Sequence, residues 1–535
     1  MTRNLTVPVT SGQKEQLLAE SRINAGMITT IDSVDIPTGA LVLALNARCR
    51  LDKTSRRPGK TNEAPAKPNS NKILGLVVFK RNDGGTHFIR FTKSSIHRRG
   101  VASWLNYTAG VGGSLTGADT DYFSTSVIFD TLAFANGVDK IQEVDTVASQ
   151  YKEVGPNSPK VKYITGFFNR IVGAYRVEGS EPNGPVSIVW CADGDRTKWP
   201  NDVTPDISCG QSSLVESPSD LSDFITGVFG GPSLLLIPRE KSIWAASKQP
   251  SASFPFNAFT ALPGIGSDCP RSIRVIPGGL AWLDTRTAQI WAWQVGAPPE
   301  EIGTPIFSDV IKGISDPSQV LGSYDTTEGE YSIVIPIAGT TVVRVWTHNR
   351  KNPTKPWVYD EIDLLSLIAD VDSPFSTVLS FDELVGTFDQ LTGTFDQLAL
   401  TGPPGKAARY YGYTNGEIYQ EDHNSDTDVG VPFSTDIQSK DFKAPSETTY
   451  FSRIRVEYKA TLEGSITLSY SKDGGESWVV SKVVNTVLNK SRSINHIRVV
   501  SAKQIRWRIT ASNGAFDLLE YSIHVQPSGE TKEGA

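Results

Sequence analysis

A strand–turn–strand unit recurs along the chain between about residues 72 and 425. Each unit has an alternating apolar and polar strand, a tight turn, a second strand and often a tryptophan. Successive turns are roughly 45 to 60 residues apart, the spacing at which four-stranded blades recur in propellers, except that the last interval is longer by about the length of residues 381–401. The turns are centred near Asp83, Asn136, Arg239, Arg286, Gly339 and Asn415, and a weaker unit lies between Arg170 and Trp190. We therefore predict an all-β protein with a β-propeller of about six to seven blades over residues 71–429.

Two of the turns contain an Asn-Gly pair, Asn136-Gly137 and Asn415-Gly416. This pair is typical of a type I′ hairpin, in which both central residues take positive φ. The sequence thus predicts type I′ turns at both places.

Eight tryptophans lie in or just after the predicted hairpins. An aromatic stripe of this kind could form a platform for sugars, but packing between neighbouring blades explains it with fewer assumptions. They are Trp190, Trp199, Trp244, Trp282, Trp291, Trp293, Trp346 and Trp357.

The regions on either side of the repeat have a different character. We interpret residues 1–70 as an N-terminal arm and docking segment, with a basic, proline-rich run at its end. Residues 430–527 alternate cleanly with a period of two and predict a separate antiparallel β-sandwich. Residues 528–535 are expected to form a flexible tail.

Residues 381–401 repeat one seven-residue phrase three times: FDELVGT, FDQLTGT and FDQLALT. The Phe and Leu spacing is that of a coiled-coil heptad, but the glycines oppose a helix. We predict consecutive turns, with the aspartates capping and the phenylalanines packing, in an insertion between two blades. Cation binding by the three aspartates is a weaker alternative. The residues are Phe381, Asp382, Phe388, Asp389, Phe395 and Asp396.

Charge and cysteine content limit the classes of function. The net charge of −6 excludes a global basic field for nucleic acid. The basic run carries Arg48, Arg50, Lys53, Arg56, Arg57 and Lys60 but no aromatic residue for stacking on bases, so we expect a protein contact or a weak phosphate contact. Cys49, Cys191, Cys209 and Cys269 are predicted to be free thiols. No apolar run reaches the ~20 residues that span a bilayer, which predicts a protein made in a cytoplasm without stable membrane insertion.

One motif resembles the Asp-box of sialidases: Ser471, Asp473, Gly475, Ser477 and Trp478. Its role is structural, because the aspartate caps a hairpin turn and the glycine permits positive φ. The six histidines are scattered, and no nucleophile elbow, Walker loop or Rossmann fingerprint is present. We therefore expect no catalytic residue, cofactor or metal site, and no enzymatic activity.

The order of these pieces resembles the tail nozzle, or tubular protein B, family of short-tailed bacteriophages and related tail hub or stopper propellers. The opening phrase LALNARCRLDKTSRRPGKT is similar to that of the family, and the matching positions are Asn46, Asp52, Arg56, Arg57, Pro58 and Gly59. FANGVDKIQEVD is similar to its Asn-Gly-Val-Asp hairpin, and PRSIRVIPGGLAWLDTRTAQIWAW to an internal blade. The heptad phrase is similar to the family's Trp-Asp-x-Leu-x-Gly-Thr segments, with Phe in place of Trp.

This resemblance implies a structural virion protein of the tail, typically a hexamer, that forms a ring-shaped conduit for DNA ejection. The implied partners are an adaptor or portal-proximal ring, tail fibre proteins and transiently passing double-stranded DNA. We further hypothesise that two acidic turns, Asp325 to Glu330 and Glu421 to Asp428, line or gate the channel. The alternatives are a glycan-binding propeller for host attachment and, with less support, a glycoside hydrolase.

Overall fold

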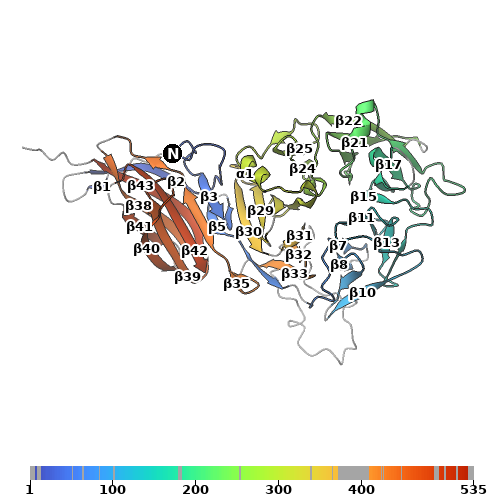
Figure 1. Ribbon diagram of the computed structural model, residues 1–535, viewed down its shortest axis with the longest axis horizontal. Helices are drawn as coiled ribbons and strands as arrows, with labels where there is room; N and C mark the ends of the chain where they lie inside the picture. Colours follow the sequence, from blue (N-terminus) through green and yellow to red (C-terminus); the bar gives the residue numbers. More distant parts are fainter. Residues whose placement is uncertain are drawn as a thin grey trace, which may run out of the picture.

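The computed structural model describes most of the chain and shows two β-rich bodies side by side (Figure 1). The described residues are 7–8, 14–50, 52–62, 65–82, 85–100, 103–178, 183–251, 255–337, 340, 342–363, 365–370, 409–422, 425, 427–446, 449–486, 493–498, 502–513 and 516–527. Within them the one α-helix is α1 (Phe307–Lys312). The predicted all-β class, a propeller with a sandwich, is confirmed.

The larger body is a propeller, and the described residues form seven four-stranded antiparallel blades. Blade 1 consists of β7 (Gly75–Lys80), β8 (Thr86–Phe91), β9 (Ile96–Arg99) and β10 (Trp104–Ala109). Blade 2 consists of β11 (Ser124–Ile128), β12 (Thr131–Ala135), β13 (Gln142–Asp145) and β14 (Gln150–Glu153). Blade 3 consists of β15 (Val161–Gly166), β16 (Ile171–Arg176), β17 (Ser187–Trp190) and β18 (Gly210–Ser213).

Blades 4 to 7 continue the ring, and the last blade takes a strand from the N-terminal region. Blade 4 consists of β19 (Phe229–Gly230), β20 (Leu234–Pro238), β21 (Ser242–Lys248) and β22 (Phe256–Pro263), and blade 5 of β23 (Arg274–Ile276), β24 (Gly279–Asp284), β25 (Gln289–Gln294) and β26 (Glu300–Glu301). Blade 6 consists of β27 (Leu321–Asp325), β28 (Glu330–Pro336), β29 (Val342–Asn349) and β30 (Trp357–Asp363). Blade 7 consists of β31 (Leu365–Asp370), β32 (Arg409–Tyr413), β33 (Ile418–Asp422) and β6 (Gly59–Asn62).

The first strand of each blade lies innermost, and β31 of the last blade adjoins β7 of the first. The ring is therefore closed at this point by packing between blades as well as by β6 on the outside. Closure in this way leaves short, protected sheet edges.

The predicted Asn-Gly turns lie where expected, between β12 and β13 and between β32 and β33, but their type is wrong. The positive φ values belong to Gly137 (78°) and Gly416 (82°), and neither asparagine is in the left-handed region. Instead, Asn136 Oδ1 accepts hydrogen bonds from the backbone N–H groups of Val138 and Asp139. The side chain thus replaces the backbone turn that a type I′ pair would form.

The eight predicted blade tryptophans are all buried. Trp282 Nε1 donates to the carbonyl of Gly266 at 2.8 Å, and Trp357 Nε1 donates to that of Ile302 at 2.7 Å. Their ring faces are covered by neighbouring strands, so the packing interpretation is confirmed for these residues. The four cysteines are free and buried, also as predicted.

The second body is a sandwich of two antiparallel sheets. Its strands after the propeller are β36 (Thr435–Ser439), β37 (Phe442–Lys443), β38 (Thr449–Ala460), β39 (Gly464–Ser471), β40 (Val479–Thr486), β41 (Ser493–Arg498), β42 (Gln504–Asn513) and β43 (Phe516–Pro527). The N-terminal strands β1 (Val7–Pro8) and β2 (Lys14–Arg22) extend one sheet in the order β1-β2-β43-β38-β41.

The other sandwich sheet is continuous with blade 6 of the propeller. Strand β3 (Leu41–Leu45) pairs antiparallel with β36 of the sandwich and parallel with β30 of the blade, giving the order β27-β28-β29-β30-β3-β36-β42-β39-β40. One hydrophobic cluster also spans both bodies, with Trp346 and Trp357 on the propeller side and Ile454 and Trp507 on the sandwich side. The two bodies therefore share both a sheet and a core.

Four further short strands complete the N-terminal segment and its partners. β4 (Ala47–Cys49) pairs with β5 (Thr54–Arg56), which pairs with β43 of the sandwich, and β34 (Thr427–Asp428) lies between β6 and β35 (Val431–Pro432). We call residues 14–62 the strap, because they add strands to the sandwich, to the shared sheet and to blade 7.

The end of the strap fits blade 7 so closely that it requires a glycine. A Cβ at Gly59 would lie 2.3 Å from the carbonyl oxygen of Thr427 and 2.8 Å from that of Ser425. Because both obstacles are backbone atoms, we expect Gly59→Ala to lower the free energy of unfolding by about 1–3 kcal/mol, measured by denaturant titration. Gly313→Ala is the control, since its nearest atom would be 3.5 Å away. Equal losses in the two variants would contradict this account of β6.

Acid should weaken the shared core through His348, which stacks on Trp357 with ring centroids 4.7 Å apart. Burial, with help from Arg350 and Lys355, lowers the pKa of His348 to about 3. The unfolded chain binds this proton below about pH 6.5, so the folded state loses stability as the pH falls from there towards 3.

Replacing this histidine by a non-titrating ring should remove that loss. In His348→Phe the decrease in the free energy of unfolding between pH 7 and pH 5 should be smaller than in the unmodified chain by roughly 2 kcal/mol. The matched control is His496→Phe, because His496 is exposed. An unchanged pH slope in His348→Phe, measured by denaturant titration at each pH, would show that this residue is not responsible.

Candidate functional site

The family-like N-terminal motif lies at the neck between the two bodies, where β3, β4, β5 and β6 meet the propeller. Asn46, at the link between β3 and β4, has φ of 53°, a conformation that asparagine tolerates better than most residues. Its Nδ2 donates to the carbonyl of Ser434 at 2.7 Å, and its Oδ1 accepts from Arg57 Nε at 2.9 Å and from the backbone N–H of Glu361 at 3.3 Å. One side chain therefore connects the strap to both bodies.

Arg48 is a buried cation of the neck that faces three carboxylates. Its Nη1 and Nη2 donate to the two carboxylate oxygens of Asp360 on β30 at 2.8 and 2.7 Å. Glu330 on β28 and Glu421 on β33 lie 3.7 and 4.0 Å from the same guanidinium. Burial alone would lower the pKa of Arg48, but the three carboxylates outweigh it and raise the pKa above its usual value. Arg48 thus joins blades 6 and 7 to the strap.

Arg57 and Lys60 share a second carboxylate, Asp428 of β34. Arg57 contacts both oxygens, at 2.9 Å through Nη1 and 2.5 Å through Nη2, and Lys60 Nζ lies 3.1 Å away. Burial would raise the pKa of Asp428, yet these two cations hold it below its ordinary value. Burial lowers the pKa of Lys60 to about 8, and Arg57 adds to the effect.

The remaining motif residues are Arg56, Pro58, Gly59 and Asp52. The guanidinium carbons of Arg56 and Arg57 lie 4.1 and 3.6 Å from the ring centre of Phe433, and Arg56 Nη2 also donates to the carbonyl of Phe433. The carbonyl of Pro58 accepts from Arg57 Nη1 at 3.0 Å, and Gly59 begins β6. Asp52 is exposed in the turn between β4 and β5.

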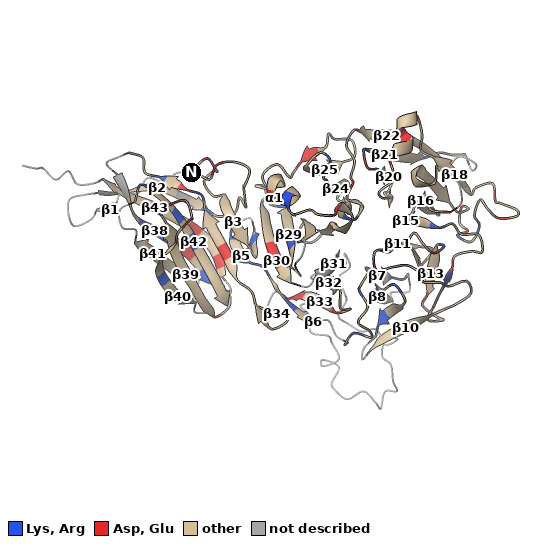
Figure 2. Cartoon of the chain, viewed as in Figure 1, with Lys and Arg blue, Asp and Glu red and all other residues tan. Residues whose placement is uncertain are grey.

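The basic run therefore makes its protein contact within its own chain. Its two more exposed members pair with the propeller and the sandwich respectively: Arg50 Nη1 lies 3.7 Å from Glu328, and Lys53 Nζ lies 2.6 Å from Asp517. Figure 2 shows acidic and basic residues close together at this neck. Much of the positive charge of the run is therefore neutralised within the chain.

Four carboxylates of the two acidic turns approach cations of the strap: Glu328, Glu330, Glu421 and Asp428. None of them belongs to the described lining of the cavity at the propeller centre. Burial next to the strap requires counter-charges for its arginines, which explains these contacts. That the two turns line or gate a channel formed by several copies stays a prediction.

The Asp-box residues form a tight turn between β39 and β40 of the sandwich. Asp473 Oδ1 accepts from Ser471 Oγ at 2.6 Å and from the backbone N–H of Ser477 at 3.0 Å, and Ser477 Oγ donates to Oδ2. These bonds hold the pKa of Asp473 well below its ordinary value. Gly475 has φ of 98°, and the Trp478 ring lies 5.2 Å from the guanidinium carbon of Arg508. All these contacts stabilise the turn.

The threefold phrase lies outside the described residues, so the packing of Phe381, Asp382, Phe388, Asp389, Phe395 and Asp396 stays a prediction. Its position in the fold differs from the expected one. The phrase connects β31 to β32, which are neighbouring strands of blade 7, so the placement between two blades is wrong. The short strand β31 has no recognisable hairpin partner in the adjacent sequence, which concealed the start of this blade.

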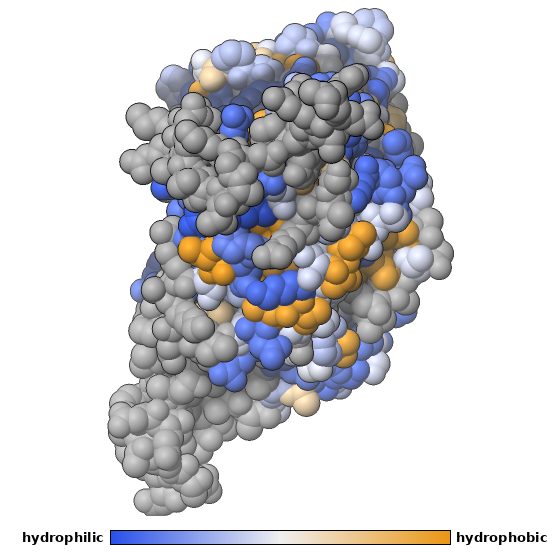
Figure 3. All heavy atoms as spheres, turned by 90° about the vertical axis from the view of Figure 1, so that its left-hand side faces the viewer, coloured by the Kyte–Doolittle hydropathy of each residue, from blue (hydrophilic) through white to orange (hydrophobic). Residues whose placement is uncertain are grey.

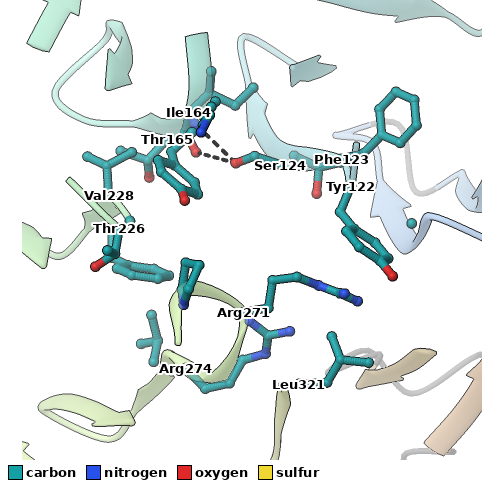
Figure 4. A pocket seen from close by; sticks show the side chains of 18 of the residues that line it. Tyr122, Phe123, Ser124, Ile164, Thr165, Thr226, Val228, Arg271, Arg274 and Leu321 are labelled. Atoms are coloured by element: carbon teal, nitrogen blue, oxygen red, sulfur yellow. Dashed lines mark hydrogen bonds between the residues drawn. The ribbon is translucent and has the colours of Figure 1, made fainter. Parts of the chain in front are cut away.

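A cavity of about 410 Å³ lies at the centre of the propeller. Residues of the innermost strands, or next to them, line it from six blades, and its described lining includes Lys162, Arg271 and Arg274 but no carboxylate. Figure 4 shows both arginines beside the open centre, opposite Ser124 and Thr165. Sequence reasoning did not identify these residues, because each blade contributes a few lining positions and no local motif connects them.

The described residues contain no group of three or more His, Cys, Asp or Glu side chains arranged to hold a metal ion. None of their helices is long and apolar enough to cross a membrane.

Comparison with known proteins identifies no family for the chain. No protein-family model and no curated protein matches it. Among solved structures, the extracellular domain of a one-component system from B. thetaiotaomicron matches 93% of this chain and 64% of its own length, at 9% identity and a TM-score of 0.40. YCF48 bound to a D1 peptide matches 68% of this chain and 99% of its own length, at 10% identity and a TM-score of 0.38.

A third solved structure matches a smaller part of the chain. TmCBM61 in complex with β-1,4-galactotriose matches 17% of this chain, and the chain spans 62% of that protein's length, at 17% identity and a TM-score of 0.14. Similarity at these levels carries no functional argument.

The neck makes a quantitative prediction. Arg48→Met would leave the buried carboxylates of Asp360 and Glu330 without their main counter-charge, so we expect the free energy of unfolding to fall by about 3–5 kcal/mol. Lys93→Met is the control, since Lys93 and Asp119 form a pair at 3.1 Å with side chains 44% and 49% exposed. Such a pair contributes about 0–1 kcal/mol. A loss in Arg48→Met as small as that of the control, in denaturant titration, would refute the role assigned to Arg48.

Proposed function

We propose that this chain is a structural subunit of a bacteriophage tail, at the nozzle or hub, and that several copies form a ring through which DNA leaves the particle. The observation that carries the proposal is the neck. A shared sheet and a shared core join the sandwich to the propeller, and ion pairs fix the strap between them to the propeller, as a rigid wall of a tube requires.

The size of the propeller cavity determines where such a conduit would be. A volume of about 410 Å³ holds on the order of a dozen waters. Duplex DNA, whose major groove alone is about 12 Å wide, is too large to enter such a space. The duplex would therefore pass between copies, along the faces that they present to the axis of the ring, and the subunits themselves would act as solid blocks.

The end of the sandwich offers a surface for contact between copies. β40 is the last strand of its sheet within the described residues, and Val479, Val480 and Val483 on it are 47%, 60% and 60% exposed. Figure 3 looks onto this end of the molecule and shows apolar side chains among hydrophilic ones. An unpaired, apolar edge strand is prone to pair with another chain, and ring closure protects it.

The glycan-binding alternative has less support. The eight tryptophans that would have formed a sugar platform are buried between strands, so they present no open ring face. An adhesive role would therefore need a different surface.

The proposal can be tested in the genome that carries the gene. Interrupting the gene should give particles that lack the end of the tail and fail to eject DNA, and an antibody against residues 430–527 should label the tail of intact particles in electron microscopy. Restoring the gene should restore both. Normal, infective particles without the gene product would reject the proposal.

The same complementation can test the β40 contact. Val480→Lys should restore fewer complete tails than the unmodified gene, because a charge would enter the interface. Val203→Lys is the control, since Val203 is 97% exposed in the propeller. Complete tails with both variants would show that copies meet elsewhere.

A further inference from the structure

One outer strand of the propeller keeps an open edge. In the sheet β19-β20-β21-β22, the outermost strand β22 pairs with β21 alone within the described residues. It has eight residues, Phe256–Pro263, and none of them is charged. The side chain of Phe259 on it is 40% exposed. An uncharged edge strand of this length, with an exposed apolar side chain, is a template for pairing with another strand.

The outer strands of the other six blades are blocked, as far as the structure describes them. β10 and β14 pair with each other, β30 pairs with β3, and β6 pairs with β34. β18 has four residues, and β26 has two, both of them glutamates. Pairing, shortness and charge are the usual ways in which proteins protect the edge of a sheet. β22 has none of these three protections.

The strand β40 at the end of the sandwich matches β22 in length and regularity. β40 also has eight residues. Its ladder with β39 shifts register at Ser481, and the ladder of β22 with β21 shifts at Ala261. Each strand therefore keeps one regular run, Lys482–Thr486 in β40 and Phe256–Thr260 in β22.

The charge on β40 does not oppose pairing. Lys482 is the one charged residue of this strand. Its Nζ donates to Asn495 Oδ1 of β41 at 2.8 Å, so the ammonium group is held towards the other sheet of the sandwich. The side chain of Val483 next to it is 60% exposed. Both regular runs thus offer a neutral, partly apolar edge.

The positions of the two edges favour a contact that repeats from copy to copy. β22 lies on the propeller, and β40 lies far from it at the end of the sandwich (Figure 1). Two copies that joined through β40 alone would form a closed pair and leave both β22 edges open. A contact between β40 of one copy and β22 of the next is heterologous, and such contacts form a ring when the rotation closes.

We propose that β40 of one copy pairs with β22 of the next, so that a sandwich sheet of one subunit continues into blade 4 of its neighbour. The inference rests on the proposed ring for its partner, a second copy of this chain, and adds the surface on which β40 docks. Two runs of this length extend only about 17 Å, so a single contact is small. Ring closure gives each copy two such contacts.

Cross-linking of introduced cysteines tests the pairing in the full chain, whose native cysteines are buried. A chain that carries both Phe259→Cys and Val483→Cys, treated at high protein concentration with a bismaleimide of about 15 Å, should give a ladder of dimers, trimers and larger species. The spacer covers a register difference of about four residues and traps transient contacts as well as stable ones. Each single variant should remain monomeric.

The matched control is the chain with Phe259→Cys and Val203→Cys. Val203 is 97% exposed and belongs to neither strand, so this pair should give no ladder. Adding Asn257→Lys to the first double variant should reduce the ladder several-fold, because it places a charge at an exposed position of β22. If Phe259→Cys lowers the unfolding temperature, Asn257→Cys takes its place in the same run.

Two results would overturn the proposal. One is a double variant that cross-links no more than its control, and the other is a dimer formed by Val483→Cys alone, which would show that β40 pairs with itself. The outcome is separate from that of the tail proposal. Labelled tails without this cross-link would reject the contact alone, and a ladder without labelled tails would reject the tail function alone.

Discussion

The pairing of the strap arginines with carboxylates of the propeller and of the strand next to its last blade is the interaction on which this architecture depends. Arg48 contacts Asp360 of blade 6, and Arg57 contacts Asp428 beside blade 7. Replacing such pairs by apolar residues is often neutral for stability, whereas leaving one partner alone is costly. The pairs therefore do less to raise stability than to select one position of the strap, in which β3 and β6 enter their sheets in register.

Closure of the propeller and attachment of the sandwich therefore both depend on the strap. The same segment supplies the outer strand of blade 7 and the strand between β30 and β36. Blade 7 lacks its outer strand until β6 has paired, and β6 follows directly on residues that pair with the sandwich. A chain in which only one of the two bodies was folded would leave buried charges without partners at the neck.

The sequence predicted the features that are local and could not predict those that join distant segments. Alternation and turn residues revealed the hairpins of most blades and the sandwich, because the two-residue period of a β-strand depends only on neighbouring residues. The pairing of β6 with β33 connects residues about 360 positions apart in sequence, and no pattern near Gly59 indicates it. The same reason explains why the partners of the acidic turns could not be predicted, since these partners lie in the strap.

The cavity shows this limit most sharply. Its lining comes from six blades that have no motif in common, so it becomes visible only when the ring is closed. A further consequence concerns the proposed conduit. In a propeller whose centre is small and basic, passage of a duplex through each subunit is sterically excluded, while the densest basic run of the chain is held inside the neck. A ring of such subunits would keep its strongest positive charges away from passing phosphates, which is the condition for fast exit, because each cation that contacts DNA adds to its retention.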